Sequence, residues 1–286
     1  MNDVLQLNNG IDIPVLGLGT WLIDNDVVDR SVMDALELGY RHVDTAQAYG
    51  NEEGVGNGCR ASGLRREDVF VVSKVAAEHK TYESAAAGID ETLLKMNLDY
   101  LDMMIIHSPQ PWADVNIEED RYKEGNVAAY TALEDAVKAG KLRALGVSNF
   151  LVDDIQNIID HCSLVPAVNQ VLCHVGNTPF ELIEYCKKND IQVEAYSPVA
   201  HGEILNHQPV VDMAKKYGVS VARLCIRYCV QLGLIVLPKS ASRDHIQENA
   251  QLNFDISSDD MEFLKGIRFA DYGDASFFPV YGGKLR

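Results

Sequence analysis

Short apolar segments alternate with amphipathic segments along almost the whole chain. The apolar segments are continuous runs more than alternating ones, which is typical of parallel strands covered on both faces. We place strands at residues 15–19, 41–45, 69–74, 102–107, 144–148, 167–171, 192–197 and 234–238. Helices are expected near residues 26–38, 52–62, 83–96, 126–139, 151–161, 179–189, 209–231 and 243–250. Such repeated strand–helix units predict a (β/α)₈ barrel.

The N-terminal segment and the lack of an internal linker also fit a single barrel. Residues 4–14 read as a β-hairpin with its turn at Asn8-Asn9-Gly10. No low-complexity linker divides the chain, so we expect one barrel domain over residues 1–286. The competing architecture, a doubly wound nucleotide-binding fold, needs Gly-x-Gly-x-x-Gly after its first strand. Residues 17–22 lack the third glycine of that pattern.

Composition excludes several classes of partner. The net charge of −17 argues against nucleic acid and anionic membranes, because both need a basic face. No apolar run approaches the ~20 residues of a membrane helix, and the N-terminus lacks the features of a signal peptide. The six cysteines show no zinc spacing, and we expect free thiols in a reducing cytoplasm. No metal site is expected.

Four reactive residue types follow three successive strands. Asp44, Lys74 and His107 stand at strand ends, and Tyr49 follows in the loop after the second strand. Active sites of such barrels lie at the carboxyl ends of the strands, so all four side chains can converge on one mouth. Each residue alone also fits a structural role: Tyr49 in packing, Lys74 in an ion pair with Asp44, and His107 in the core. Together they predict a proton-donating site centred on Tyr49.

Residues 39–56 carry a more specific pattern, Gly-Tyr-Arg-His-Val-Asp-Thr-Ala-Gln-Ala-Tyr-Gly-Asn-Glu-Glu-Gly-Val-Gly. This segment resembles the signature of the aldo-keto reductases at its defining positions, with Glu52 and Gly56 in place. The resemblance extends over nearly the whole chain. In that family the N-terminal hairpin closes the barrel bottom and a C-terminal loop shapes the substrate pocket.

The resemblance implies reduction of an aldehyde or ketone to an alcohol, with hydride from nicotinamide C4 and a proton from Tyr49. A carbonyl that accepts a hydride develops negative charge on oxygen and needs a nearby proton donor. An ordinary phenol has a pKa near 10, and an adjacent ammonium lowers it. Lys74 is the candidate for that ammonium. Asp44 would keep Lys74 charged, and His107 would hydrogen-bond the substrate oxygen.

Later strand ends match the family's cofactor contacts. The residues that correspond to carboxamide ligands are Ser148, Asn149 and Gln170, whose hydroxyl and amide groups suit a primary amide. Tyr196 corresponds to the aromatic residue that stacks on the nicotinamide ring. Further contacts are expected from Gly19, Thr20, Asp44, Ser197, Pro198 and Val199. The alternative for Ser148 and Asn149 is a helix cap.

The segment after the eighth strand departs from the family at one position. Lys239 and Ser240 match ligands of the adenosine 2′-phosphate, and Glu248 and Asn249 match adenine contacts. His245 stands where most NADPH-dependent members carry an arginine, which is always charged and grips phosphate bidentately. We expect NADPH as the cofactor, with NADH as the alternative. Arg243 is interpreted as surface charge.

The substrate pocket is expected to include Trp21, Tyr49, His107 and Trp112. Ser108 follows His107 where family members often have a tryptophan, so Trp112 either fills that space or caps the loop elsewhere. The aromatic tail at residues 269–286 is expected to cross the barrel top. The expected partner is a small carbonyl compound, and the expected assembly is a monomer or weak homodimer.

Two other functions remain open at this point. A non-catalytic barrel of the same family could serve as a regulatory subunit, which the four reactive residues disfavour. A metal-dependent barrel hydrolase needs clustered histidines and carboxylates at strand ends. His42 and His107 are the histidines near the relevant strands. Turnover of a nicotinamide cofactor with an aldehyde, and sensitivity to chelation, separate these classes.

Overall fold

The computed structural model describes residues 3–116 and 122–284, and within them parallel strands form the wall of a barrel. The strand order is β10-β9-β8-β7-β6-β5-β4-β3. Parallel bridges from Leu16 to Val236 and from Gly19 to Lys239 join the two ends of this sheet. The strands are β3 (Leu18–Gly19), β4 (His42–Asp44), β5 (Phe70–Val75), β6 (Leu101–Ile106), β7 (Leu142–Ser148), β8 (Val168–Leu172), β9 (Gln192–Tyr196) and β10 (Ile235–Leu237). This topology confirms the predicted (β/α)₈ barrel.

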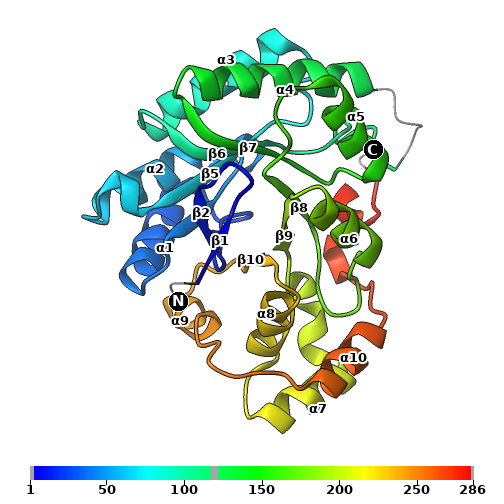
Figure 1. Cartoon of the computed structure of the whole chain (residues 1–286). Helices are drawn as coiled ribbons and strands as arrows, with labels where there is room; N and C mark the ends of the chain where they lie inside the picture. The colour runs from blue at the N-terminus through cyan, green and yellow to red at the C-terminus, as the bar shows by residue number, and fades with distance from the viewer. Residues whose placement is uncertain (1–2, 117–121, 285–286) are drawn as a thin grey trace.

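Helices surround the ring of strands (Figure 1). They are α1 (Asn25–Glu37), α2 (Glu52–Ala61), α3 (Tyr82–Met96), α4 (Lys123–Lys138), α5 (Val152–His161), α6 (Phe180–Lys188), α7 (Gln208–Tyr217), α8 (Val221–Gln231), α9 (Arg243–Asn249) and α10 (Ser258–Gly266). Short 3₁₀ turns are η1 (Gln47–Tyr49), η2 (Arg66–Asp68), η3 (Ala200–Asn206), η4 (Gly273–Phe277) and η5 (Pro279–Tyr281). No helix in these described ranges is long and apolar enough to span a bilayer.

One predicted helix is wrong. The segment 209–231 forms two helices, because Gly218 ends α7 in the left-handed conformation at φ 63°. Ser220 then caps α8 by accepting a hydrogen bond from the Arg223 N–H. The amphipathic pattern continues across this break, so periodicity alone did not reveal it. Helix α10 was not predicted.

The N-terminal hairpin closes one end of the barrel, as predicted. Strands β1 (Val4–Gln6) and β2 (Asp12–Pro14) pair antiparallel, and Figure 1 shows them across the ring of strands. The turn is anchored by Asn8 Nδ2, which donates to Pro166 O at 3.0 Å, and by Asn9 Nδ2, which donates to Arg143 O at 3.1 Å. Both carbonyls lie at or before the starts of strands, so the hairpin covers the end opposite the site.

The barrel interior changes from apolar to polar along the strands. Side chains alternate between the two faces of a strand, so residues two apart share the interior. Near the hairpin the interior is filled by Leu7, Ile13, Phe70, Val72, Met103, Ile105, Ala144, Ala167, Val168 and Ile235. At the other end the same faces present Asp44, Lys74, His107, Ser148, Gln170 and Tyr196. This arrangement directs the reactive side chains to one mouth.

Candidate active site

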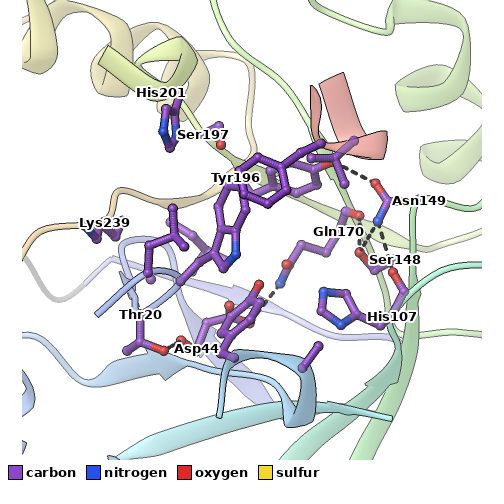
Figure 2. Close-up of a pocket in the computed structure, with 18 of the residues that line it drawn as sticks. Thr20, Asp44, His107, Ser148, Asn149, Gln170, Tyr196, Ser197, His201 and Lys239 are labelled. Atoms are coloured by element: carbon purple, nitrogen blue, oxygen red, sulfur yellow. Dashed lines mark hydrogen bonds between the residues drawn. The ribbon is translucent and has the colours of Figure 1, made fainter. Parts of the chain in front are cut away.

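A cavity of about 520 Å³ opens at the carboxyl ends of the strands. It is lined by three of the predicted catalytic residues, Asp44, Tyr49 and His107, and by the predicted substrate residues Trp21 and Trp112. Predicted cofactor residues that line it are Gly19, Thr20, Asp44, Ser148, Asn149, Gln170, Tyr196, Ser197, Pro198, Val199 and Lys239. Figure 2 shows many of these side chains converging from different strands. The structure therefore brings most of the predicted site residues together.

Lys74 is fully buried and binds both Asp44 and Tyr49. Its ammonium nitrogen lies 2.6 Å from Asp44 Oδ1, 2.8 Å from Thr45 O and 3.2 Å from Tyr49 Oη. An ammonium has three N–H groups and no lone pair, so these contacts use all of them. Tyr49 Oη must accept from Lys74, which leaves the phenolic hydrogen free for another acceptor.

The electrostatics of this group keep Tyr49 protonated. Burial raises the pKa of Tyr49 above its ordinary value, and the charge of Lys74 lowers it in part. The predicted lowering by Lys74 is present, but burial outweighs it. Burial also lowers the pKa of Lys74, yet Asp44 and Tyr49 more than offset that effect and leave it raised. A charged lysine beside a neutral phenol suits a proton-donating site.

His107 is neutral and lies against two aromatic rings. Burial, followed by the charge of Lys74, holds the pKa of His107 well below its ordinary value. The ring centroids of His107 and Tyr49 are 5.5 Å apart, and those of His107 and Trp112 are 5.0 Å apart. Trp112 thus packs edge-on against His107, so of the two predicted positions it takes the one at the pocket.

The predicted carboxamide ligands form a hydrogen-bonded network (Figure 2). Asn149 Nδ2 donates to His107 O at 3.0 Å and to Ser148 Oγ at 3.1 Å. Asn149 Oδ1 accepts from Tyr196 Oη at 2.7 Å, so the Asn149 amide is engaged within the protein. Gln170 Nε2 donates to Asp44 Oδ2 at 2.9 Å. The helix-cap alternative for Ser148 and Asn149 finds no support, because α5 begins after Leu151 without their side chains.

Most residues that were predicted to bind the adenosine end of the cofactor lie outside the cavity. Ser240, His245, Glu248 and Asn249 are not among the residues that line it, whereas Lys239 is. His245 is exposed on α9, and Ser240 Oγ is engaged with the backbone of Ser242. Arg243 donates to Asp34 and Glu37 on α1, which supports its interpretation as surface charge.

The C-terminal segment forms the roof of the cavity, as predicted, although residues 285–286 of the predicted loop lie outside the described residues. Phe278, Pro279 and Val280 line the cavity, and Phe278 contacts Trp21 edge-on with ring centroids 4.9 Å apart. The hydroxyl groups of Tyr281 and Ser197 are 2.7 Å apart. The aromatic content of the tail was the sequence signal for this role.

Several lining residues were not predicted. These are Leu22, Ala48, His201, Gly202 and Leu237. His201 lies in a run of left-handed residues with Ala200 and Gly202, at φ 57°, 48° and 100°. Nothing in the sequence pattern marks such a turn apart from Gly202. Buried Glu194, which bonds Gln170 below the cavity, was also missed, although a carboxylate inside an apolar strand segment was a visible signal.

Comparison with known proteins agrees with this architecture. Residues 15–268 match the model of the aldo/keto reductase family. Glyoxal reductase of Bacillus subtilis is 39% identical over 269 residues, which cover 93% of this chain and 93% of that protein. An aldehyde reductase of Saccharomyces cerevisiae is 37% identical, covering 92% of this chain and 90% of that protein. The crystal structure of an aldo/keto reductase from Brucella melitensis superposes with a TM-score of 0.85 at 34% identity, covering 93% and 99% of the two chains. The chain belongs to the aldo/keto reductase family of oxidoreductases.

Proposed function

We propose that the protein is an NAD(P)H-dependent reductase that converts a small aldehyde or ketone to an alcohol, with Tyr49 as proton donor. The observation that carries this proposal is the buried Lys74 ammonium, which joins Asp44 to the hydroxyl of Tyr49 at the cavity. Relatives named glyoxal reductase and aldehyde reductase support a carbonyl substrate.

The residues present fit a nicotinamide cofactor. Gln170 lines the cavity, and within the described part of the chain its Oε1 accepts no hydrogen bond. Lys239 also lines the cavity and forms no ion pair with any described residue, so its charge is available to a phosphate. When bound, the cofactor supplies the hydride. Gln170 and Ser148 would hold its carboxamide, Tyr196 its ring, and Lys239, Ser240 and His245 the 2′-phosphate of NADPH.

Residues of the chain itself would donate the proton and stabilise the charge that its transfer leaves behind. Tyr49 Oη accepts from Lys74, so its hydrogen can be donated to an oxygen in the cavity. The Lys74 charge stabilises the phenolate left behind, and Asp44 holds Lys74 in place. Neutral His107 can donate one N–H to the substrate oxygen while negative charge develops there. Trp21, Trp112 and Phe278 exclude water from this end of the cavity.

The deciding experiment measures oxidation of NADPH and NADH with glyoxal, aromatic aldehydes, keto acids and sugars. We expect turnover with aldehydes, faster with NADPH, and no loss after exhaustive chelation. Absence of cofactor oxidation with the whole panel would favour the non-catalytic alternative, and loss on chelation would favour a metal-dependent enzyme. Among residues 3–116 and 122–284 no group of three or more histidine, cysteine or carboxylate side chains could hold a metal ion.

A further inference from the structure

Inside the barrel, one layer below the catalytic residues, His42 faces Glu194. They precede Asp44 and Tyr196 by two positions on β4 and β9, so their side chains share the same inward faces. Both residues are 0% exposed. His42 Nε2 lies 3.7 Å from Glu194 Oε1, and neither atom has a hydrogen-bond partner among the described residues. Unpaired buried polar atoms are costly, so this arrangement requires an explanation.

The groups around His42 and Glu194 indicate which of the two side chains carries the proton between them. His42 Nδ1 lies 3.3 Å from Pro14 O, and a carbonyl can only accept, so Nδ1 carries a hydrogen. The lone pair of neutral Nε2 then faces Glu194 Oε1, which is favourable only if that oxygen is protonated. Burial lowers the pKa of His42 to about 4 and raises that of Glu194 to about 8. These shifts favour the proton on Glu194 at neutral pH, an arrangement that avoids two separated charges between side chains that are both fully buried.

The charges around the pair act on it from the neighbouring strands. Asp44 on β4 raises the pKa of Glu194 further, whereas Lys74 on β5 lowers it. For His42, Asp44 and Asp102 raise the pKa and Lys74 lowers it, but burial is the largest effect. The single positive charge of Lys74 is already held by Asp44 at 2.6 Å. A second carboxylate at Glu194 would lack its own counter-charge among these groups.

Glu194 also fixes the orientation of Gln170. Gln170 Nε2 lies 2.9 Å from Asp44 Oδ2 and 2.9 Å from Glu194 Oε2. Two carboxyl oxygens flank this end of the amide, so it must be the nitrogen, and both of its N–H groups are used. The amide oxygen is left as the free group of a residue that lines the cavity.

We propose that Glu194 is a positioning residue: it keeps a proton on Oε1 toward His42 and, with Asp44, holds the Gln170 amide so that its oxygen can accept from the nicotinamide carboxamide. The proposal rests on the proposed function for its cofactor. Protonated Glu194 suits both neighbours at once, because its Oε2 accepts from Gln170 while its Oε1–H points toward His42. Glu194 itself touches no substrate, since it does not line the cavity.

Two substitutions separate the parts of this proposal. Glu194→Gln reproduces the protonated carboxyl, with a carbonyl oxygen for Gln170 and an N–H for His42. Glu194→Met keeps the side-chain length but removes one of the two acceptors, so Asp44 alone holds the Gln170 amide. The readout is the Kd for NADPH compared with the Kd for 2′-phospho-ADP-ribose, which lacks the nicotinamide.

We expect Glu194→Met to weaken NADPH about tenfold, the worth of one hydrogen bond, with no change for the fragment. Glu194→Gln should show the same ratio of the Kd for NADPH to the Kd for 2′-phospho-ADP-ribose as wild type. An unchanged ratio in Glu194→Met would overturn the positioning role. A ratio in Glu194→Gln as poor as in Glu194→Met would overturn the assignment of the proton.

A second measurement needs neither cofactor nor turnover. The infrared difference spectrum between wild type and Glu194→Gln at neutral pH should show the carbonyl band of one protonated carboxyl group. Absence of this band would contradict the proposal. This measurement does not depend on whether Glu194→Met folds. Glu52 is another buried carboxyl with a raised pKa, but it is present in both proteins, so its band cancels in the difference spectrum. Failure of wild type to bind NADPH or NADH would overturn the proposed function and with it the positioning role, whereas the infrared band would still decide where the proton lies.

Discussion

The ammonium nitrogen of Lys74 lies 3.2 Å from the hydroxyl oxygen of Tyr49, close to the wall of the cavity. Because the ammonium can only donate, this contact leaves the phenolic hydrogen for an acceptor inside the cavity. The same lysine is paired with Asp44, so one buried cation connects a structural ion pair with the proposed proton donor. Lys74 therefore has two separable roles, one in stability and one in proton donation.

Tyr49→Phe removes the hydroxyl and keeps the ring. We expect kcat for carbonyl reduction to fall by about 10²–10⁴-fold, the usual contribution of a positioned proton donor. Cofactor affinity should change little, because the aromatic ring remains in place. Steady-state kinetics with a reactive aldehyde and a fluorescence titration of NADPH provide the two measurements. A variant that keeps more than a tenth of the wild-type kcat, with chemistry rate-limiting, would exclude Tyr49 as the donor.

Lys74→Met should abolish reduction and lower the free energy of unfolding together. It leaves Asp44 as a buried carboxylate without its cation, and breaking a buried pair in this way costs about 3–5 kcal/mol. The matched control is Asp44→Asn combined with Lys74→Met, which removes both charges. The double variant should regain stability in urea unfolding but stay inactive. Equal stability of the single and double variants would show that the ion pair is not the reason for the loss.

The barrel was predictable to within a residue or two at most strand ends, because buried parallel strands leave continuous apolar runs in the sequence. The convergence of Asp44, Lys74 and His107 followed from the same strand ends. The division at Gly218 was not predictable from periodicity, since both helices keep an amphipathic pattern. The left-handed turn at His201 had Gly202 as its single sequence signal. Glu194 was visible as a carboxylate inside an apolar segment, but its position opposite His42 depends on two strands that are distant in sequence.

The stability of the protein should depend on pH through Glu194. Its folded pKa of about 8 lies above its ordinary value of 4.5. A raised folded pKa gives stability that is fully present below the unfolded pKa and is lost as pH rises through about 8. The free energy of unfolding of wild type should therefore fall, relative to Glu194→Gln, between about pH 4.5 and pH 8. Urea unfolding of both proteins across this pH range provides the measurement, and parallel pH profiles would contradict this assignment.

Tyr281→Phe should loosen the roof of the cavity without affecting the barrel. It removes the contact between the hydroxyl groups of Tyr281 and Ser197, which contributes about 1 kcal/mol. Hydrogen exchange should become faster in residues 273–284 and stay unchanged in the strands. Tyr82→Phe is the matched control, because it removes an exposed contact to Asp135 between two residues that do not line the cavity. Equal exchange of the roof in wild type and Tyr281→Phe would show that this contact does not hold it.

His245→Arg tests how the chain selects its cofactor. His245 is exposed on α9, and Lys239 lines the cavity. Imidazole is mostly neutral above neutral pH, whereas guanidinium stays charged and can bind phosphate through two hydrogen bonds. We expect the variant to bind NADPH about 10- to 150-fold more tightly, the range for a charge-assisted hydrogen bond, and to leave NADH unchanged.

The matched control for this gain is Gln247→Arg. It adds the same charge at an exposed position of α9, but residues two apart on a helix point in different directions, so this charge faces away from position 245. It separates direct contact with the 2′-phosphate from a general effect of positive charge on a protein of net charge −17. The Kd values for both cofactors are measured at pH 8 for wild type and the two variants. Equal NADPH affinity of wild type and His245→Arg at pH 8 would place position 245 away from the phosphate. An equal gain in Gln247→Arg would attribute the effect to overall charge, and selectivity for NADPH would then rest on Lys239 and Ser240.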